Sequence, residues 1–260
     1  MGWLQLAKKE QQGRVWLLDE IRGFSILGMV LYHGVYDLVF IFGIDFPFFY
    51  SPLMNGVRTF FAGVFIFISG CACRFSHSNL RRGAVCFGLG MAMTVVTLLV
   101  IPSEAIFFGV LHCLGLCMLI FGLAKPLLDK LSPLAGLAVW GVLFFLLYRL
   151  PAGAVGIPYL LELPVPSSLY ATPFLFPLGL PSAGFFSSDY FPLIPWLLLF
   201  LAGSYAGVWI KEGRFPQAFY RKHCPFLVQA GQHTLLIYVL HQPVLYGLMW
   251  LLFHAARWAS

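Results

Sequence analysis

Long apolar runs alternate with short polar segments along this chain, and each run is about 20 residues long. A bilayer core about 30 Å thick needs roughly 20 residues of helix to cross it. The pattern therefore predicts an all-α fold, a polytopic transmembrane helix bundle of about seven spans. The predicted spans are residues 16–42, 57–73, 83–101, 105–123, 134–150, 191–210 and 234–253.

Residues 151–190 interrupt this pattern. The segment is rich in Pro and Gly and contains no Lys or Arg, yet it stays apolar. A loop of this length is uncommon and usually functional. We expect an irregular segment here, with a re-entrant piece or a hidden eighth span as the alternatives. A chain of 260 residues otherwise predicts a single transmembrane domain over residues 1–260.

Composition agrees with a membrane protein. The chain is 60% hydrophobic and 10% charged, and its mean hydropathy is +0.86, whereas a soluble domain carries about 25% charged residues. A net charge of +6 would be compatible with a nucleic-acid partner. However, the basic residues lie in short loops between apolar runs, which is the pattern of membrane orientation. We therefore expect the lipid bilayer as a partner and no nucleic acid.

The basic loops predict the orientation of the chain. They alternate with loops that hold carboxylates, so one membrane face is basic. This predicts a multi-pass protein of the inner membrane, with a cytoplasmic N-terminus and an outer C-terminus. A cleavable signal peptide is not expected, because charged residues interrupt the first apolar run. The basic loops contain Lys8, Lys9, Arg14, Arg74, Arg81, Arg82, Lys125, Lys130, Lys211, Arg214, Arg221 and Lys222.

The six cysteines do not indicate a disulfide framework. None lies in a predicted outer loop, where oxidation would occur. Cys71 and Cys73 have one residue between them, which is not the spacing of a zinc ribbon. We expect six reduced thiols, no metal site and no bound cofactor.

The first span carries a polar stripe. Arg22 and His33 are eleven residues apart, about three helical turns, so they share one face. Asp19 lies one turn before Arg22, and Asp37 lies one turn after His33. Ionisable groups inside a spanning helix are costly and usually mark function. A carboxylate beside an imidazole is the arrangement that a general base needs. Arg22 lies nearer the cytoplasm, and its planar guanidinium is suited to bind a phosphate or carboxylate.

Two other spans each contribute a histidine. His112 lies in the outer half of the fourth span, and His241 lies near the middle of the last one. Together with His33 they are expected to face one cavity. Trp196 follows two prolines at the start of the sixth span, and it is expected either to line the site or to anchor the helix at the interface.

Five segments of the chain, in order, resemble the heparan-alpha-glucosaminide N-acetyltransferase catalytic-domain family, in its short bacterial branch. The Arg22 to His33 spacing also resembles the first helix of the related membrane acyltransferase-3 family. The five segments are LDEIRGFSILGMVLYHGVYDL (18–38), FFAGVFIFISG (60–70), FFGVLHCLG (107–115), DYFPLIPWLLLFLAG (189–203) and GQHTLLIYVLHQP (231–243).

The resemblance implies an integral-membrane acyltransferase. Cytoplasmic acetyl-CoA or another acyl-CoA would be the donor, and a glycan or lipid-linked sugar on the outer side would be the acceptor. By motif position His33 would be the base or acyl carrier, and Arg22 would act on the donor side. From the spacing we expect Asp37 to assist His33 in catalysis. The other expected substrate- or donor-binding residues are Asp19, His112, His241 and Trp196. A homodimer stays open. The alternatives are a proton-coupled transporter that uses the polar stripe, and a haem protein with two of the histidines as ligands.

Overall fold

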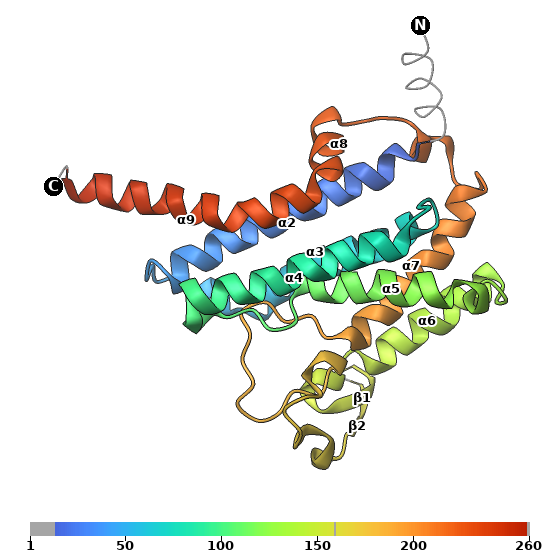
Figure 1. Cartoon of the computed structure of the whole chain (residues 1–260), viewed down its shortest axis with the longest axis horizontal. Helices are drawn as coiled ribbons and strands as arrows, with labels where there is room; N and C mark the ends of the chain where they lie inside the picture. Colours follow the sequence, from blue (N-terminus) through green and yellow to red (C-terminus); the bar gives the residue numbers. More distant parts are fainter. Residues whose placement is uncertain (1–13, 159, 259–260) are drawn as a thin grey trace, which may run out of the picture. The chain divides into compact units, whose positions relative to one another are not determined.

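The structure is a computed structural model that describes residues 14–158 and 160–258. It confirms the all-α class, because seven of the described helices are long and apolar enough to cross a membrane (Figure 1). The chain is therefore a multi-pass membrane protein. Lys8 and Lys9, which belong to the predicted basic N-terminus, lie outside the described residues.

Each predicted span overlaps one long helix. The short helix α8 precedes the last of them and was not predicted. Helix α3 begins five residues early, because Pro52 suits the first helical position. The helices are α2 (Trp16–Phe40), α3 (Pro52–Cys73), α4 (Asn79–Val100), α5 (Val110–Leu128), α6 (Pro133–Leu147), α7 (Leu193–Lys211), α8 (Pro225–Gln232) and α9 (Thr234–Trp258).

The fourth span, predicted at 105–123, is displaced by five residues at both ends. The prediction had placed residues 106 and 107 in the first turn of this span, but side chains bind their backbone N–H groups. Thr97 Oγ1 accepts the Ile106 N–H at 3.1 Å, and Ser187 Oγ accepts the Phe107 N–H at 2.9 Å. These bonds satisfy the backbone outside a helix, so α5 begins only at Val110.

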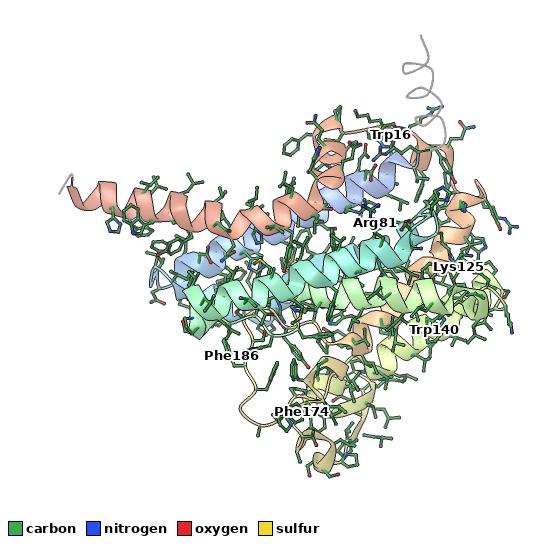
Figure 2. All side chains as sticks on the ribbon, in the orientation of Figure 1. Trp16, Arg81, Lys125, Trp140, Phe174 and Phe186 are labelled. Atoms are coloured by element: carbon green, nitrogen blue, oxygen red, sulfur yellow. The ribbon has the colours of Figure 1, made fainter. Side chains whose placement is uncertain are left out.

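The segment 151–190 is irregular, as predicted. In its described part the regular structure consists of short 3₁₀ turns and one antiparallel hairpin, β1 (Ala154–Ile157) with β2 (Leu161–Pro164). Several apolar side chains stay exposed; Phe174 and Phe186, labelled in Figure 2, are 80% and 58% exposed. No span-length helix occurs in the described part of this segment, so a hidden eighth span finds no support.

The chain divides into two compact units. Unit 1 comprises residues 1–65 and 215–260, and unit 2 comprises residues 66–214. The single domain over residues 1–260 stays a prediction. In unit 1, α2 packs against both α8 and α9. The approach of α2 to α8 depends on two glycines, because a Cβ at Gly23 would overlap the Leu227 carbonyl and one at Gly231 would overlap the Asp19 carbonyl.

Unit 2 is built around α5 and α7. Helix α5 contacts α4 and α7, and α6 packs on α7 and on the hairpin (Figure 1). The end of α3 approaches α7 through Gly70, where a Cβ would overlap the Phe200 carbonyl. Phe121, Phe200 and Tyr205 are fully buried in this core. All six cysteines of the chain are free thiols, as expected, and five of them are buried.

Candidate functional site

The first two turns of α2 carry an ion-pair cluster in unit 1. Asp19 Oδ2 accepts from Arg14 Nε at 2.7 Å, and its Oδ1 accepts from Arg22 Nη1 at 3.2 Å. The Asp19 carboxylate is buried and bridges two guanidinium groups. Helical spacing of three residues brings Asp19 and Arg22 together, as the sequence predicted. Arg22 is therefore oriented by a carboxylate, which limits the positions its planar fork can take.

Glu20, beside this cluster, is a residue that sequence reasoning missed. Its Oε1 accepts the backbone N–H groups of His223 and Cys224 at 2.6 and 2.8 Å, and its Oε2 lies 3.1 Å from His223 Nδ1. Glu20 is buried, although it is charged. It joins α2 to the residues that lead into α8. Nothing in the sequence pairs two positions that lie 203 residues apart.

The indole of Trp16 covers the same end of unit 1. The Arg14 guanidinium lies 5.3 Å from its ring centroid, and the Lys222 ammonium lies 5.5 Å from it. Cations at this distance are attracted by the ring quadrupole. Helix α2 therefore begins in a basic environment that includes Arg14, Arg22 and Lys222.

Two of the three predicted histidines meet in unit 1. The ring centroids of His33 on α2 and His241 on α9 are 5.1 Å apart. His241 Nδ1 lies 2.6 Å from the Tyr238 carbonyl oxygen. Because a carbonyl only accepts, Nδ1 of His241 carries the proton, and in the neutral ring Nε2 holds the lone pair. Tyr32 and Tyr36 complete the ring contacts of His33.

A buried carboxylate lies one turn further along α2. Asp37 is 0% exposed, and its Oδ1 accepts a hydrogen bond from Gln242 Nε2 at 2.5 Å. Gln242 directly follows His241, so two successive residues of α9 contact the polar stripe of α2. The Gln242 Oε1 atom is buried and has no hydrogen-bond partner among the described residues. The sequence placed Gln242 next to His241 but contained no sign that it meets Asp37.

His112 lies in unit 2, in the first turn of α5. Its Nε2 is 3.3 Å from Thr94 Oγ1, and the ring stacks on Phe108 with centroids 5.7 Å apart. Thr94 donates its hydroxyl proton to the Ile106 carbonyl at 2.7 Å. The Thr94 oxygen is thus available to accept the His112 Nε2 proton. His112 is buried, and these bonds give it a structural role in the turn before α5.

Trp196 also lies in unit 2, near the start of α7. Its ring is buried, with centroids 5.3 Å from Phe191, 5.9 Å from Phe144 and 6.5 Å from Tyr148. An interfacial anchor would expose its indole N–H edge to the headgroup region. Trp196 instead packs in an aromatic cluster, and its predicted role in lining the substrate or donor site stays a prediction.

Within the described residues, no group of three His, Cys, Asp or Glu side chains could hold a metal ion. The side chains of unit 1 themselves offer two imidazoles, a buried carboxylate and an arginine. An imidazole pair can accept and pass on a proton near neutral pH.

Comparison with known proteins supplies the class of reaction. Residues 14–243 match the sequence model of a family described as heparan-alpha-glucosaminide N-acetyltransferase, catalytic. The match includes Arg22, His33, Asp37 and His241. The searches of curated proteins and of solved structures found no match.

Proposed function

Because the chain belongs to the heparan-alpha-glucosaminide N-acetyltransferase catalytic family, we propose that this membrane acetyltransferase moves an acyl group from cytoplasmic acyl-CoA to a sugar on the outer side. The observation that supports this most directly is the pair of His33 and His241, with ring centroids 5.1 Å apart. Ionisable groups are rare within spanning helices, because burying them in the bilayer costs free energy. Two imidazoles and a buried carboxylate on neighbouring helices therefore indicate a function.

In the proposed transfer, the acceptor oxygen or nitrogen attacks the thioester carbonyl carbon. The new C–O or C–N bond forms, the C–S bond breaks, and the sulfur leaves as a thiolate. His33 takes the proton of the acceptor, and protonation of the thiolate gives the free thiol of CoA. Such a positioned base contributes about 10² to 10⁴ in rate. An acyl group carried on a histidine is the alternative route.

The neighbouring groups fit this proposal. Gln242 Oε1 is a buried oxygen without a partner among the described residues, so an acceptor hydroxyl or amine would satisfy it by donating a hydrogen bond. The Asp37 carboxylate beside Gln242 would stabilise the positive charge that develops on the imidazole. His241 is the second ring next to His33. The lining roles of His112 and Trp196 stay predictions, because both residues lie in unit 2.

The function is tested by measuring thiol release from acetyl-CoA by the purified protein in detergent, with and without a mixture of glycan acceptors. An acyltransferase releases thiol in proportion to acylated product, which mass spectrometry detects. A proton-coupled carrier would release none. Acceptor-dependent release is expected, and its absence with every acceptor would contradict the proposal.

Arg22 is the proposed donor-side residue, together with Asp19. Replacing Arg22 by lysine is expected to weaken acyl-CoA binding while the protein still inserts and folds, because lysine keeps the charge but loses the bidentate fork. Arg14→Lys is the matched control, since Arg14 pairs with the same carboxylate. Binding is measured by titration calorimetry. If both variants weaken binding equally, or neither does, Arg22 only stabilises the cluster.

We also propose the orientation indicated by the basic loops. The loop near Ser78 would be cytoplasmic and the C-terminus would be outside. A reporter inserted near Ser78 is expected to read as inside, and one fused after Ser260, which lies outside the described residues, to read as outside. An odd number of crossings, as seven candidate helices would make, supports this proposal because it puts the two termini on opposite faces. A cytoplasmic C-terminus would mean that residues 151–190 cross the membrane or that one apolar helix does not.

A further inference from the structure

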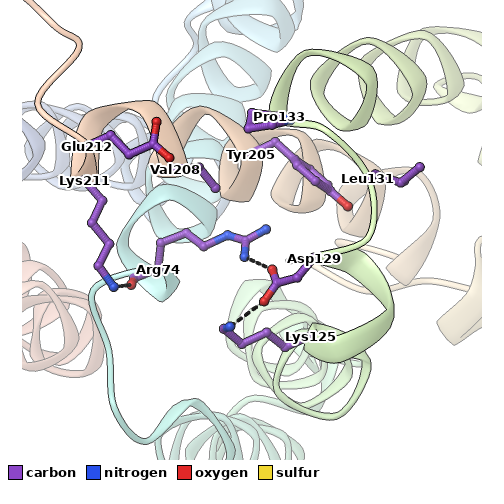
Figure 3. A pocket seen from close by; sticks show the side chains of 9 residues that line it. All are labelled: Arg74, Lys125, Asp129, Leu131, Pro133, Tyr205, Val208, Lys211 and Glu212. Carbon is purple, nitrogen blue, oxygen red and sulfur yellow. Dashed lines mark hydrogen bonds and ion pairs between the residues drawn. The ribbon is translucent and has the colours of Figure 1, made fainter.

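Unit 2 contains a cavity of about 630 Å³ that lies apart in sequence from the proposed acyl-transfer residues. The ends of α3, α5 and α7 and the start of α6 contribute its walls (Figure 3). These ends follow the second, fourth and sixth spans, so they belong to the same face of a membrane bundle. The volume is in the range of small-molecule sites, about 300–1,000 Å³. The cavity is lined by Arg74, Lys125, Asp129, Leu131, Pro133, Tyr205, Val208, Lys211 and Glu212.

Arg74 is the buried cation of this cavity. The sequence placed it in a basic loop, but its side chain is only 7% exposed. Its Nε donates to the Ser204 carbonyl at 2.9 Å, and its guanidinium lies 5.0 Å from the Phe121 centroid and 5.3 Å from the Tyr205 centroid. Nη1 pairs with Asp129, while Nη2 has no partner among the described residues. The guanidinium is thus fixed in place with donor capacity unused.

Asp129 occupies the space between two cations. Its carboxylate pairs with Arg74 and with Lys125 Nζ, the latter at 2.5 Å. Burial raises the pKa of Asp129, but the hydrogen bonds from Lys125 and Arg74 outweigh it and lower that pKa below its ordinary value. The residue directly follows the last turn of α5, where the helix dipole disfavours an anion. Its side chain is 37% exposed, so it can rotate out of the cavity.

The cavity has an excess of positive charge. Lys211 Nζ donates to the Arg74 carbonyl at 3.0 Å and forms no ion pair among the described residues. The other carboxylate, Glu212, pairs with Arg214 at 2.9 Å. Of the two carboxylates in the lining, Asp129 is therefore the one that pairs with cations of the cavity, Arg74 and Lys125. Three cations around one exchangeable carboxylate leave room for a second, more highly charged anion.

We propose that this cavity binds a phosphate-bearing anion, whose phosphate displaces the Asp129 carboxylate from Arg74 and Lys125. A phosphate has more acceptor oxygens and more charge than a carboxylate, and an arginine fork with lysines beside it is the usual way to bind one. The phosphate could belong to a soluble nucleotide or to an anionic lipid headgroup, since both carry the same group. The proposal depends on the cavity alone and not on acyl transfer.

Two probes distinguish the sources. Adenosine 3′,5′-bisphosphate is titrated calorimetrically into the full chain in detergent. Native mass spectrometry then compares phosphatidylglycerol with phosphatidylcholine. Binding of the nucleotide alone assigns a soluble ligand, and selective binding of phosphatidylglycerol assigns a lipid headgroup. If neither binds, the proposal is wrong.

Variants test where the probe binds. Lys125 is half-exposed, so Lys125→Gln should fold normally, and we expect it to weaken binding about tenfold through loss of one charge-assisted hydrogen bond. Lys130→Gln is the matched control, because it makes the same charge change five residues further on, outside the cavity lining. Asp129→Asn is expected to tighten binding, because it removes the competing charge. Equal losses from Lys125→Gln and Lys130→Gln, or weaker binding by Asp129→Asn, would overturn the proposal.

Discussion

Replacing His33 by alanine is expected to abolish measurable acyl transfer without unfolding the protein. His33 lies in the C-terminal half of α2, next to His241 and one turn before the buried Asp37. Loss of a positioned general base costs about 10² to 10⁴ in rate. The measurement is single-turnover transfer from acetyl-CoA, with purified variants whose thermal melting matches that of the parent.

Three further variants separate the roles. His241→Ala should reduce the rate less than His33→Ala, and His112→Ala should reduce it least, since His112 is bonded to Thr94 in unit 2. Asp37→Asn should lower the rate but preserve the fold, because asparagine keeps an oxygen that can accept from Gln242 Nε2. A stable His33→Ala variant with a near-parental rate would refute this mechanism and move the chemistry to His241 or His112.

Replacing Glu20 by alanine is expected to give the largest loss of stability in unit 1. The change removes the acceptor of two backbone N–H groups, those of His223 and Cys224. A buried donor left without a partner costs about 1–3 kcal/mol, so the two together cost about 2–6 kcal/mol. The link between α2 and the residues before α8 would be lost, and thermal melting in detergent measures the effect.

Two controls show which part of the interaction matters. Glu20→Gln keeps a side-chain oxygen for the two N–H groups and should cost much less than Glu20→Ala. His223→Ala removes only the half-exposed imidazole, whose ion pair with Glu20 is worth about 1 kcal/mol or less. If Glu20→Ala melts like the parent, the two hydrogen bonds do not stabilise unit 1, and the connection depends on the packing of Gly23 and Gly231 instead.

The number and approximate position of the spans could be predicted from the sequence. A helix in lipid satisfies its own backbone hydrogen bonds, so length and apolarity alone indicate where each span lies. The first, sixth and last spans begin within two residues of the predicted positions. The fourth span was misplaced by five residues, because Thr97 and Ser187 bind backbone groups of the preceding turn. Such side-chain bonds are specific to one geometry and leave no periodic pattern.

The polar stripe of α2 could also be predicted, because the helical period alone puts Asp19, Arg22, His33 and Asp37 on one face. The ion pair of Asp19 with Arg22 is the local result of that period. Periodicity does not say which helix a face meets. The contacts of His33 with His241 and of Asp37 with Gln242 join residues more than 200 positions apart, so only the packing of α9 on α2 decides them.

Burial of charge was the other property that tertiary structure decided. Arg74 and Glu20 both looked like ordinary charged residues near span ends, yet both are buried. A charged side chain leaves water only where other groups replace its hydration. For Arg74 these are the Ser204 carbonyl, the Phe121 ring and Asp129. Because they come from α5 with its C-terminal end and from α7, far from Arg74 in the chain, no local stretch of sequence contains the information that assembles them.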